Sequence, residues 1–246
     1  MIKNFKITIE YDGTRYHGWQ RQKEDRTIQQ EIEQALCSMT THQVKLNGSG
    51  RTDAGVHALG QVANFQCETD LSPAVFQKGL NSLLPKDIVI RDCRLVDQSF
   101  HARYDVKSKI YHYKILNRKV PTAIGRQYAW FVRRKLDITA MRSAIAYIIG
   151  THDFKSFEGT GSPRSHTTRN AMAAELKENK DGSVVFIIEA DGFLRHMVRN
   201  IVGTLVDVGL GKITPAEFKD ILESKNRANA SATAPPHGLF LMEVKY

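Results

Sequence analysis

Cysteine is scarce in this chain of 246 residues: there are three, Cys37, Cys67 and Cys93, and no two stand in a CxxC spacing. Their odd number argues against a disulfide framework, so a reducing, cytoplasmic setting is expected. The sequence also lacks any run of about 18 apolar residues, the length that spans a bilayer. Its first residues, MIKNFKITIEYDG, alternate polar and apolar side chains where a signal peptide would have an apolar core. The sequence therefore predicts neither export nor membrane insertion.

Acidic residues are in the minority, with 26 Asp and Glu against 35 Lys and Arg, which gives a formal charge of +9. The excess is local, because residues 91–135 hold twelve cations and three acids and so carry a net charge equal to that of the whole chain. Four tyrosines are interleaved with these cations: Tyr104, Tyr111, Tyr113 and Tyr128. A solvated basic face is one interpretation, but cations mixed with aromatic rings favour a surface that contacts RNA.

The apolar residues recur with the period of a strand in some segments and of a helix in others. Residues 5–11 alternate as in a strand with one buried face, and residues 27–39 repeat at helical spacing behind Thr27, a candidate N-cap. Further strands are expected at residues 44–46, 61–66, 88–96, 109–116, 128–132, 171–176, 183–189 and 239–244. Further helices are expected after Pro73, around Met141 to Ile149, and at residues 193–206 and 215–222.

This order of elements, without a regular βαβ repeat, predicts an α+β fold. The preferred architecture has two ferredoxin-like (RNP-like) halves that form a largely antiparallel sheet with helices on one face. The halves are expected to be residues 1-105 and 106-246, joined near residue 105.

One segment, residues 48–57 with the sequence GSGRTDAGVH, concentrates small and charged residues. It packs three glycines around Arg51 and Asp53, and small residues let another stretch of backbone approach closely. No Gly-Lys-Ser/Thr ending follows, so the segment is not a P-loop. Taken alone, it would be a tight turn in which Arg51 and Asp53 satisfy each other or the backbone.

This segment resembles the catalytic signature of the tRNA pseudouridine synthase A family. The similarity continues in order along nearly the whole chain, through Tyr11-Asp12-Gly13-Thr14, Gly18-Trp19-Gln20, Phe100-His101-Ala102-Arg103, Lys109 with Tyr111 and Tyr113, residues 150–154 and residues 193–203. The resemblance implies an isomerase, an intramolecular transferase that converts uridine to pseudouridine in the anticodon stem-loop of transfer RNA. It also implies an active-site cleft between the two halves.

The resemblance assigns roles to individual residues. Asp53 is expected to be the catalytic carboxylate, paired with Arg199, and Tyr111 to pack against the target base and help to remove its C5 proton. Arg51 is expected to assist in flipping the nucleotide out of its stack. Lys109, and Arg164 in the polar loop of residues 158–168, are further candidates for RNA binding.

The reaction moves a base without net redox change or loss of a group, so no cofactor and no metal are expected. The chain has nine histidines, among them His57, but neither an HExxH motif nor a Cys/His ligand spacing. We therefore expect most histidines to lie on the surface or to contact RNA. The family resemblance further implies a homodimer that binds the anticodon arm of transfer RNA across both subunits.

Two other functions remain open on the sequence. One is a noncatalytic RNA-binding protein or chaperone of the same fold, which would use the basic surface but not Asp53. The other is a hydrolase with Asp53 as nucleophile, for which no paired acid stands nearby in the sequence.

Overall fold

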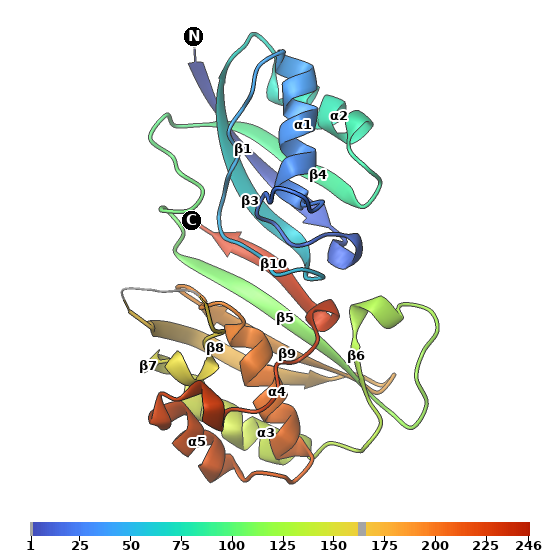
Figure 1. Cartoon of the computed structure of the whole chain (residues 1–246), viewed down its shortest axis with the longest axis vertical. Coiled ribbons are helices and arrows are strands. Elements are labelled where there is room, and N and C mark those ends of the chain that lie inside the picture. Colours follow the sequence, from blue (N-terminus) through green and yellow to red (C-terminus); the bar gives the residue numbers. More distant parts are fainter. Residues whose placement is uncertain (1, 162–165) are drawn as a thin grey trace. The chain divides into compact units, whose positions relative to one another are not determined.

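The computed structural model describes residues 2–161 and 166–246 (Figure 1). The chain divides into two compact units, an N-terminal unit of Met1–Lys107 with Phe240–Tyr246 and a C-terminal unit of Ser108–Leu239. The last strand thus belongs mainly to the N-terminal unit. The division at residue 105 that was predicted from the sequence had placed this strand in the C-terminal half. This placement in the N-terminal unit follows from its pairing with a strand of that unit.

The N-terminal unit is built on a mostly antiparallel sheet in the order β4-β1-β3-β10. Its strands are β1 (Ile2–Tyr11), the short β2 (Asn47–Gly48), β3 (His57–Glu68), β4 (Ile88–Val96) and β10 (Leu239–Lys245). β1 runs antiparallel to both β3 and β4, and β2 pairs antiparallel with Ala63 and Asn64 in the middle of β3. β10 is the exception, because it pairs in parallel with the first residues of β3, Phe240 opposite His57.

Two helices, α1 (Ile28–Thr40) and α2 (Pro73–Leu83), cover one face of this sheet (Figure 1). Each starts with a side chain that accepts a hydrogen bond from a backbone N–H of its first turn, Thr27 for α1 and Ser72 for α2. Three buried rings meet where α2 packs on the sheet: Phe5 of β1, Phe65 of β3 and Phe76 of α2, with centroids 4.7–5.2 Å apart. This aromatic cluster is the centre of the N-terminal core.

The C-terminal unit repeats the plan with an antiparallel sheet in the order β5-β9-β8-β7. Its strands are β5 (Ser108–Asn117), β6 (Trp130–Val132, parallel to β5), β7 (Gly150–Asp153), β8 (Thr168–Glu178) and β9 (Ser183–Ala190). Its helices, on one face of that sheet in Figure 1, are α3 (Ile138–Ile145), α4 (Met197–Gly209) and α5 (Pro215–Ser224). The mixed α+β class with largely antiparallel strands is confirmed.

Three local predictions differ from the structure. Residues 44–46 form no strand, because the backbone N–H and C=O of Leu46 bond to side chains of α1 instead of to a neighbouring strand. α4 begins at Met197, four residues later than expected, because His196 has a left-handed backbone (φ 60) that cannot continue a helix backwards. The sequence did not predict β7, because its four residues are too few to show the alternation of polar and apolar side chains that marks a strand.

Candidate active site

Asp53 lies half-buried in the loop between β2 and β3, near the middle of the glycine-containing segment. The backbone turns there, with the N–H of Val56 donating to the carbonyl of Asp53 at 3.2 Å. Gly55 takes the positive φ of 77° that this turn needs and that glycine adopts without strain. We call residues 49–56 the Asp53 turn.

Residues that follow β1 hold the Asp53 turn on both sides of the carboxylate. The N–H of Trp19 donates to the carbonyl of Thr52 at 3.1 Å, and the N–H of Gly55 donates to the carbonyl of Tyr16 at 3.2 Å. At the end of β1, the buried Tyr11 hydroxyl shares a 2.8 Å hydrogen bond with Thr52 Oγ1. Tyr11 and Trp19, which lie in the segments that resemble the family near the start of the chain, therefore support the turn that carries Asp53.

Two glycines make this close approach possible. Gly18 has a φ of 90°, and a Cβ atom there would lie 2.5 Å from the Thr52 carbonyl oxygen. A Cβ atom on Gly13 would lie 2.0 Å from the Val56 carbonyl oxygen. Any larger residue at either position would push the Asp53 turn away from its present place.

The other side of the Asp53 turn is fixed by β3. Ser49 donates its backbone N–H to Val62 at 2.8 Å and its hydroxyl to Gln61 Oε1 at 2.6 Å. The amide nitrogen of Gln61 donates in turn to the carbonyl of Gly50 at 3.2 Å. Since Ser49 and Gln61 are buried, water does not compete for these bonds.

His57 closes the turn from within the core, which contradicts the expectation of a surface or RNA-contacting histidine. Its ring stacks on Phe240 of β10 with centroids 4.7 Å apart, and only about 1% of the residue is exposed. Its Nδ1 accepts the N–H of Gly13 at 3.1 Å and lies 3.1 Å from Asp12 Oδ1. Its position between two apolar residues, Val56 and Ala58, was the one feature of the sequence that could have indicated a buried histidine.

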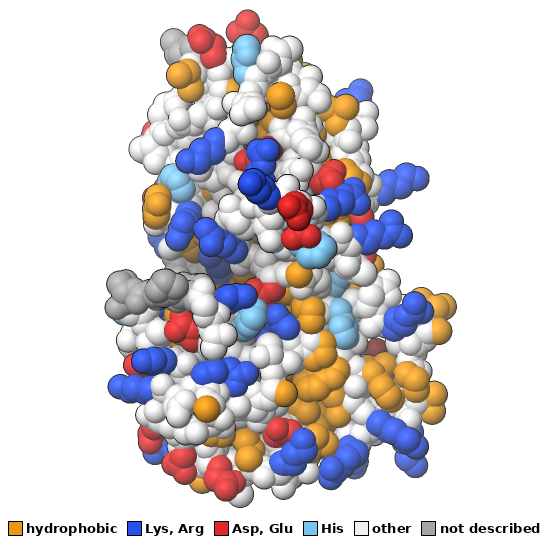
Figure 2. All heavy atoms as spheres, viewed as in Figure 1, with side chains coloured by type: hydrophobic (Ala, Val, Ile, Leu, Met, Phe, Trp, Pro, Cys, Tyr) orange, Lys and Arg blue, Asp and Glu red, His pale blue; other side chains and the backbone are white. Residues whose placement is uncertain are grey.

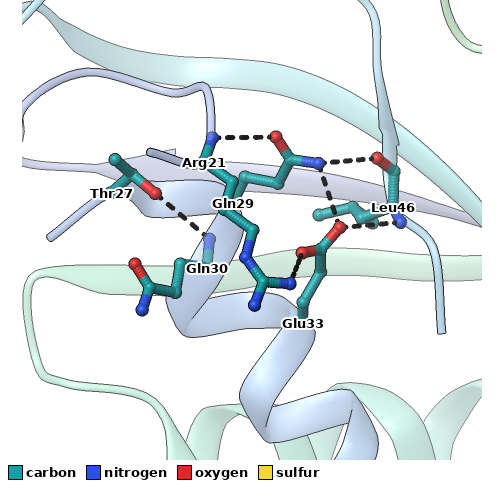
Figure 3. A network of polar contacts seen from close by, with 6 residues as sticks. All are labelled: Arg21, Thr27, Gln29, Gln30, Glu33 and Leu46. Carbon is teal, nitrogen blue, oxygen red and sulfur yellow. Dashed lines mark hydrogen bonds and ion pairs between the residues drawn. The ribbon is translucent and has the colours of Figure 1, made fainter. Parts of the chain in front are cut away.

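The polar loop before α1 is tied to the same framework. Gln29 lies at the centre of this network: its Oε1 accepts the N–H of Arg21, and its Nε2 donates to Glu33 and to the Leu46 carbonyl (Figure 3). Glu33 also accepts the N–H of Leu46 and pairs with the Arg21 guanidinium at 3.4 Å. Because the N–H of Gln29 bonds to the carbonyl of Trp19, the network also fixes the residue that holds Thr52.

Removing the Tyr11 hydroxyl should weaken this support measurably. Tyr11→Phe leaves the buried Thr52 hydroxyl without this partner, and we expect the free energy of unfolding to fall by about 1–2 kcal/mol. Urea denaturation of Tyr11→Phe, Thr52→Val and the double variant provides the measurement. If the hydrogen bond couples the two residues, the double variant loses less than the two single losses combined. Fully additive losses would contradict this account.

Tyr111 and Lys109 lie on β5 of the C-terminal unit. The Tyr111 and Phe193 rings form a T-shaped pair, with centroids 4.9 Å apart and planes at 77°. The residue is 8% exposed and its strand pairs with β9, so its ring has a fixed position. Lys109 stands two residues earlier, on the same face of the strand, and is half-buried.

Arg199 lies in the first turn of α4 and is held by the segment before β10. Its Nε donates to the Ala234 carbonyl at 2.8 Å, and its own carbonyl accepts the N–H of Ala234 at 3.1 Å. Burial lowers the pKa of His237, and the nearby Arg199 charge lowers it further. Burial also raises the pKa of Tyr113, whose hydroxyl donates to Pro235, although Arg199 opposes this shift. The segment of residues 234–237 was not anticipated as a support for Arg199.

The remaining predicted site residues are distributed as follows. Arg51 is exposed in the Asp53 turn, and Arg164 lies outside the described residues. Within residues 2–161 and 166–246, no group of three or more His, Cys, Asp or Glu residues could hold a metal ion. In the same part of the chain, no helix has both the length and the apolar character needed to cross a membrane.

Comparison with known proteins identifies the class to which this fold and this turn belong. A family model described as tRNA pseudouridine synthase matches residues 7–105 and 144–246, which include the Asp53 turn and α4.

Several relatives are named tRNA pseudouridine synthase A. The one from Acetivibrio thermocellus is 48% identical over 245 residues and the one from Thermoanaerobacter sp. is 47% identical, with 100% of both chains covered in each case. A protein from Clostridium perfringens named tRNA pseudouridine synthase A 2 is 44% identical with the same coverage. The chain therefore belongs to the tRNA pseudouridine synthase A family, and the resemblance seen in the sequence is confirmed.

Proposed function

We propose that this chain isomerises uridine to pseudouridine in the anticodon stem-loop of transfer RNA, with Asp53 as the catalytic carboxylate. The similarity to relatives named tRNA pseudouridine synthase A, over the whole length of the chain, carries the proposed activity. The role of Asp53 is supported by the Asp53 turn, which is anchored to β3 and to residues 11–19. A carboxylate on so fixed a backbone can meet a reacting sugar and base in one defined geometry.

The reaction breaks the bond between N1 of uracil and C1′ of ribose and forms a bond from C5 to C1′. The base turns over between these steps, N1 gains a proton and C5 loses one, so substrate and product have the same composition. An ionised carboxylate beside C1′ can assist bond cleavage, and it must remain ionised in a pocket that excludes water.

Three further residues complete the proposed site. Arg199 would pair with Asp53 and keep it ionised, and the bond from its Nε to Ala234 supports a fixed guanidinium direction. Tyr111 would pack against the target base and help to remove the C5 proton, a role that suits a ring held by Phe193. Arg51 is exposed beside Asp53 and would occupy the space that the flipped base leaves.

The RNA would be held mainly through its phosphates. Figure 2 shows many Lys and Arg side chains at the surface. We propose that Lys109, the exposed Lys107 and Arg118, and also Arg164 contact the phosphates of the RNA. We further propose that the protein acts in the cytoplasm as a homodimer, which sedimentation at micromolar concentration would test.

The triple variant of Lys107, Lys109 and Arg118 to Gln should bind transfer RNA more weakly and with a flatter salt dependence. Each lost phosphate contact lowers the slope of log affinity against log salt by about 0.9, so the slope should fall by about 2–3. Binding titrations at several salt concentrations give this slope. Changing three other exposed lysines, Lys78, Lys180 and Lys219, to Gln provides a charge-matched control. If both triple variants lower the slope by the same amount, Lys107, Lys109 and Arg118 do not form the RNA-binding surface.

The proposed activity is tested by release of tritium from transfer RNA that carries C5-tritiated uridine. The wild-type protein should release it, with and without a chelator, and nuclease digestion of the product should yield pseudouridine from the anticodon arm. Tight RNA binding without release would favour a noncatalytic RNA-binding protein. Free uracil among the products would favour a hydrolase.

A further inference from the structure

Tyr104 exposes 73% of its surface, which is unusual for a large aromatic side chain. It lies after β4, in the segment of residues 97–107 that leads to the end of the N-terminal unit. By contrast, Tyr11, Tyr16 and Tyr113 are buried. An exposed ring of this size adds nothing to the core, so the stability of the unit does not explain it.

The ring nevertheless has a defined place. It lies over the imidazole of His101, with centroids 4.3 Å apart and planes at 37°, and the Arg103 guanidinium carbon is 5.8 Å from its centroid. A single backbone turn arranges these three side chains, because the N–H groups of Tyr104 and Asp105 both donate to the His101 carbonyl. The Asp105 carboxylate closes this turn by accepting the N–H of His101 at 2.8 Å.

The turn rests on buried polar contacts. Ala102 is fully buried; its N–H donates to Asn64 Oδ1 at 2.9 Å, and its carbonyl accepts the Tyr246 hydroxyl at 2.7 Å. Asn64 in turn bonds to Asn4, whose amide donates to the Phe100 carbonyl. β1, β3 and the residue after β10 therefore all anchor the backbone beneath the exposed ring. The backbone that carries Tyr104 is therefore firmly held, while the outer face of the Tyr104 ring is exposed to solvent.

We propose that Tyr104, with His101 and Arg103, is a stacking platform for an unpaired base of the RNA substrate, separate from the residues assigned to chemistry. An aromatic face with a neighbouring guanidinium suits a nucleobase, because every base offers a flat π-face and its phosphate attracts the cation. RNA is favoured over a protein partner because the platform lies in the stretch of residues 91–135, which carries a net charge of +9. The identity of that RNA as transfer RNA rests on the proposed function.

The test compares Tyr104 variants in binding to an unmodified transfer RNA transcript and in tritium release. Tyr104→Ala should raise Kd and KM by about 5- to 150-fold, the effect of one lost stacking contact, while single-turnover release at saturating enzyme stays unchanged. Tyr104→Phe and Tyr104→Trp should restore binding, because they keep the aromatic face. Ultraviolet irradiation of the wild-type complex should crosslink Tyr104 to the RNA.

Tyr147→Ala is the matched control, since Tyr147 is 37% exposed and also has a nearby cation, Lys219, 5.9 Å from its ring centroid. It should bind within about twofold of the wild-type protein. An unchanged Kd for Tyr104→Ala, or a Phe variant as defective as the Ala variant, would overturn the platform. So would a loss of binding that follows a change in sedimentation, which would place Tyr104 in a protein interface. Failure of the proposed function would look different: binding would depend on Tyr104, but no variant would release tritium.

Discussion

Replacing Asp53 with Asn is expected to reduce pseudouridine formation by a factor on the order of 10⁴ or more while the affinity for transfer RNA stays within about twofold. The amide has nearly the shape of the carboxylate but no negative charge, so it cannot assist cleavage of the glycosidic bond. The backbone bonds from Trp19 to Thr52, from Gly55 to Tyr16 and from Val56 to Asp53 run through main-chain groups, which the substitution leaves in place. Single-turnover tritium release at saturating enzyme isolates the chemical step.

Asp70→Asn is the control for this experiment, because Asp70 is an exposed carboxylate of the same unit that lies outside the proposed site. It should release tritium at the wild-type rate. Asp53→Asn should also melt at nearly the wild-type temperature, which separates lost chemistry from lost folding. Substantial release by Asp53→Asn would remove Asp53 from its catalytic role.

The second large effect is expected from Gly18→Ala, a change outside the Asp53 turn itself. The added Cβ atom would lie 2.5 Å from the Thr52 carbonyl oxygen, so the backbone beside Asp53 must shift. A displacement of about 1 Å at a reacting group costs on the order of 10²-fold in rate. We therefore expect the single-turnover rate to fall about 10²-fold, more than the lost stability alone would produce.

Gly211→Ala separates this displacement from simple backbone strain. Gly211 also has a positive φ, 68°, but a Cβ atom there would have no neighbour within 4 Å. Both variants should lose about 1 kcal/mol of stability through the left-handed backbone, and Gly18→Ala should lose more through its clash. Only Gly18→Ala should lose catalytic rate at a temperature where both are folded. Equal rates for the two would show that the Asp53 turn tolerates the shift.

The sequence predicted the elements that a local pattern defines. Thr27 and the apolar spacing behind it located α1, and the alternation over residues 5–11 located β1. What failed were features set by contacts between distant residues. The bonds from Leu46 to Gln29 and Glu33 replace a strand, and the left-handed His196 shortens α4, yet neither leaves a periodic trace.

For the candidate site too, the sequence predicted some features and not others. The resemblance named Asp53 and Arg199, because their motifs recur in order along the chain. The supports of these residues were hidden, since Trp19 bonds to Thr52 and Arg199 bonds to Ala234 across more than thirty positions of sequence. His57 was misplaced for the same reason: its burial depends on Phe240, at the far end of the chain. One-dimensional patterns carry no information about such partners.

The position of β10 has a consequence for the synthesis of the protein. Residues 240–246 belong to the N-terminal unit, but the ribosome makes them only after the entire C-terminal unit. Until they emerge, β3 lacks its parallel partner and the His57 ring lacks Phe240. During synthesis, the N-terminal unit therefore exposes the edge of β3 that β10 later covers. Chaperones and proteases recognise chains with such unpaired strand edges. A chain interrupted shortly before its end would keep every proposed catalytic residue and still be unfinished around Asp53.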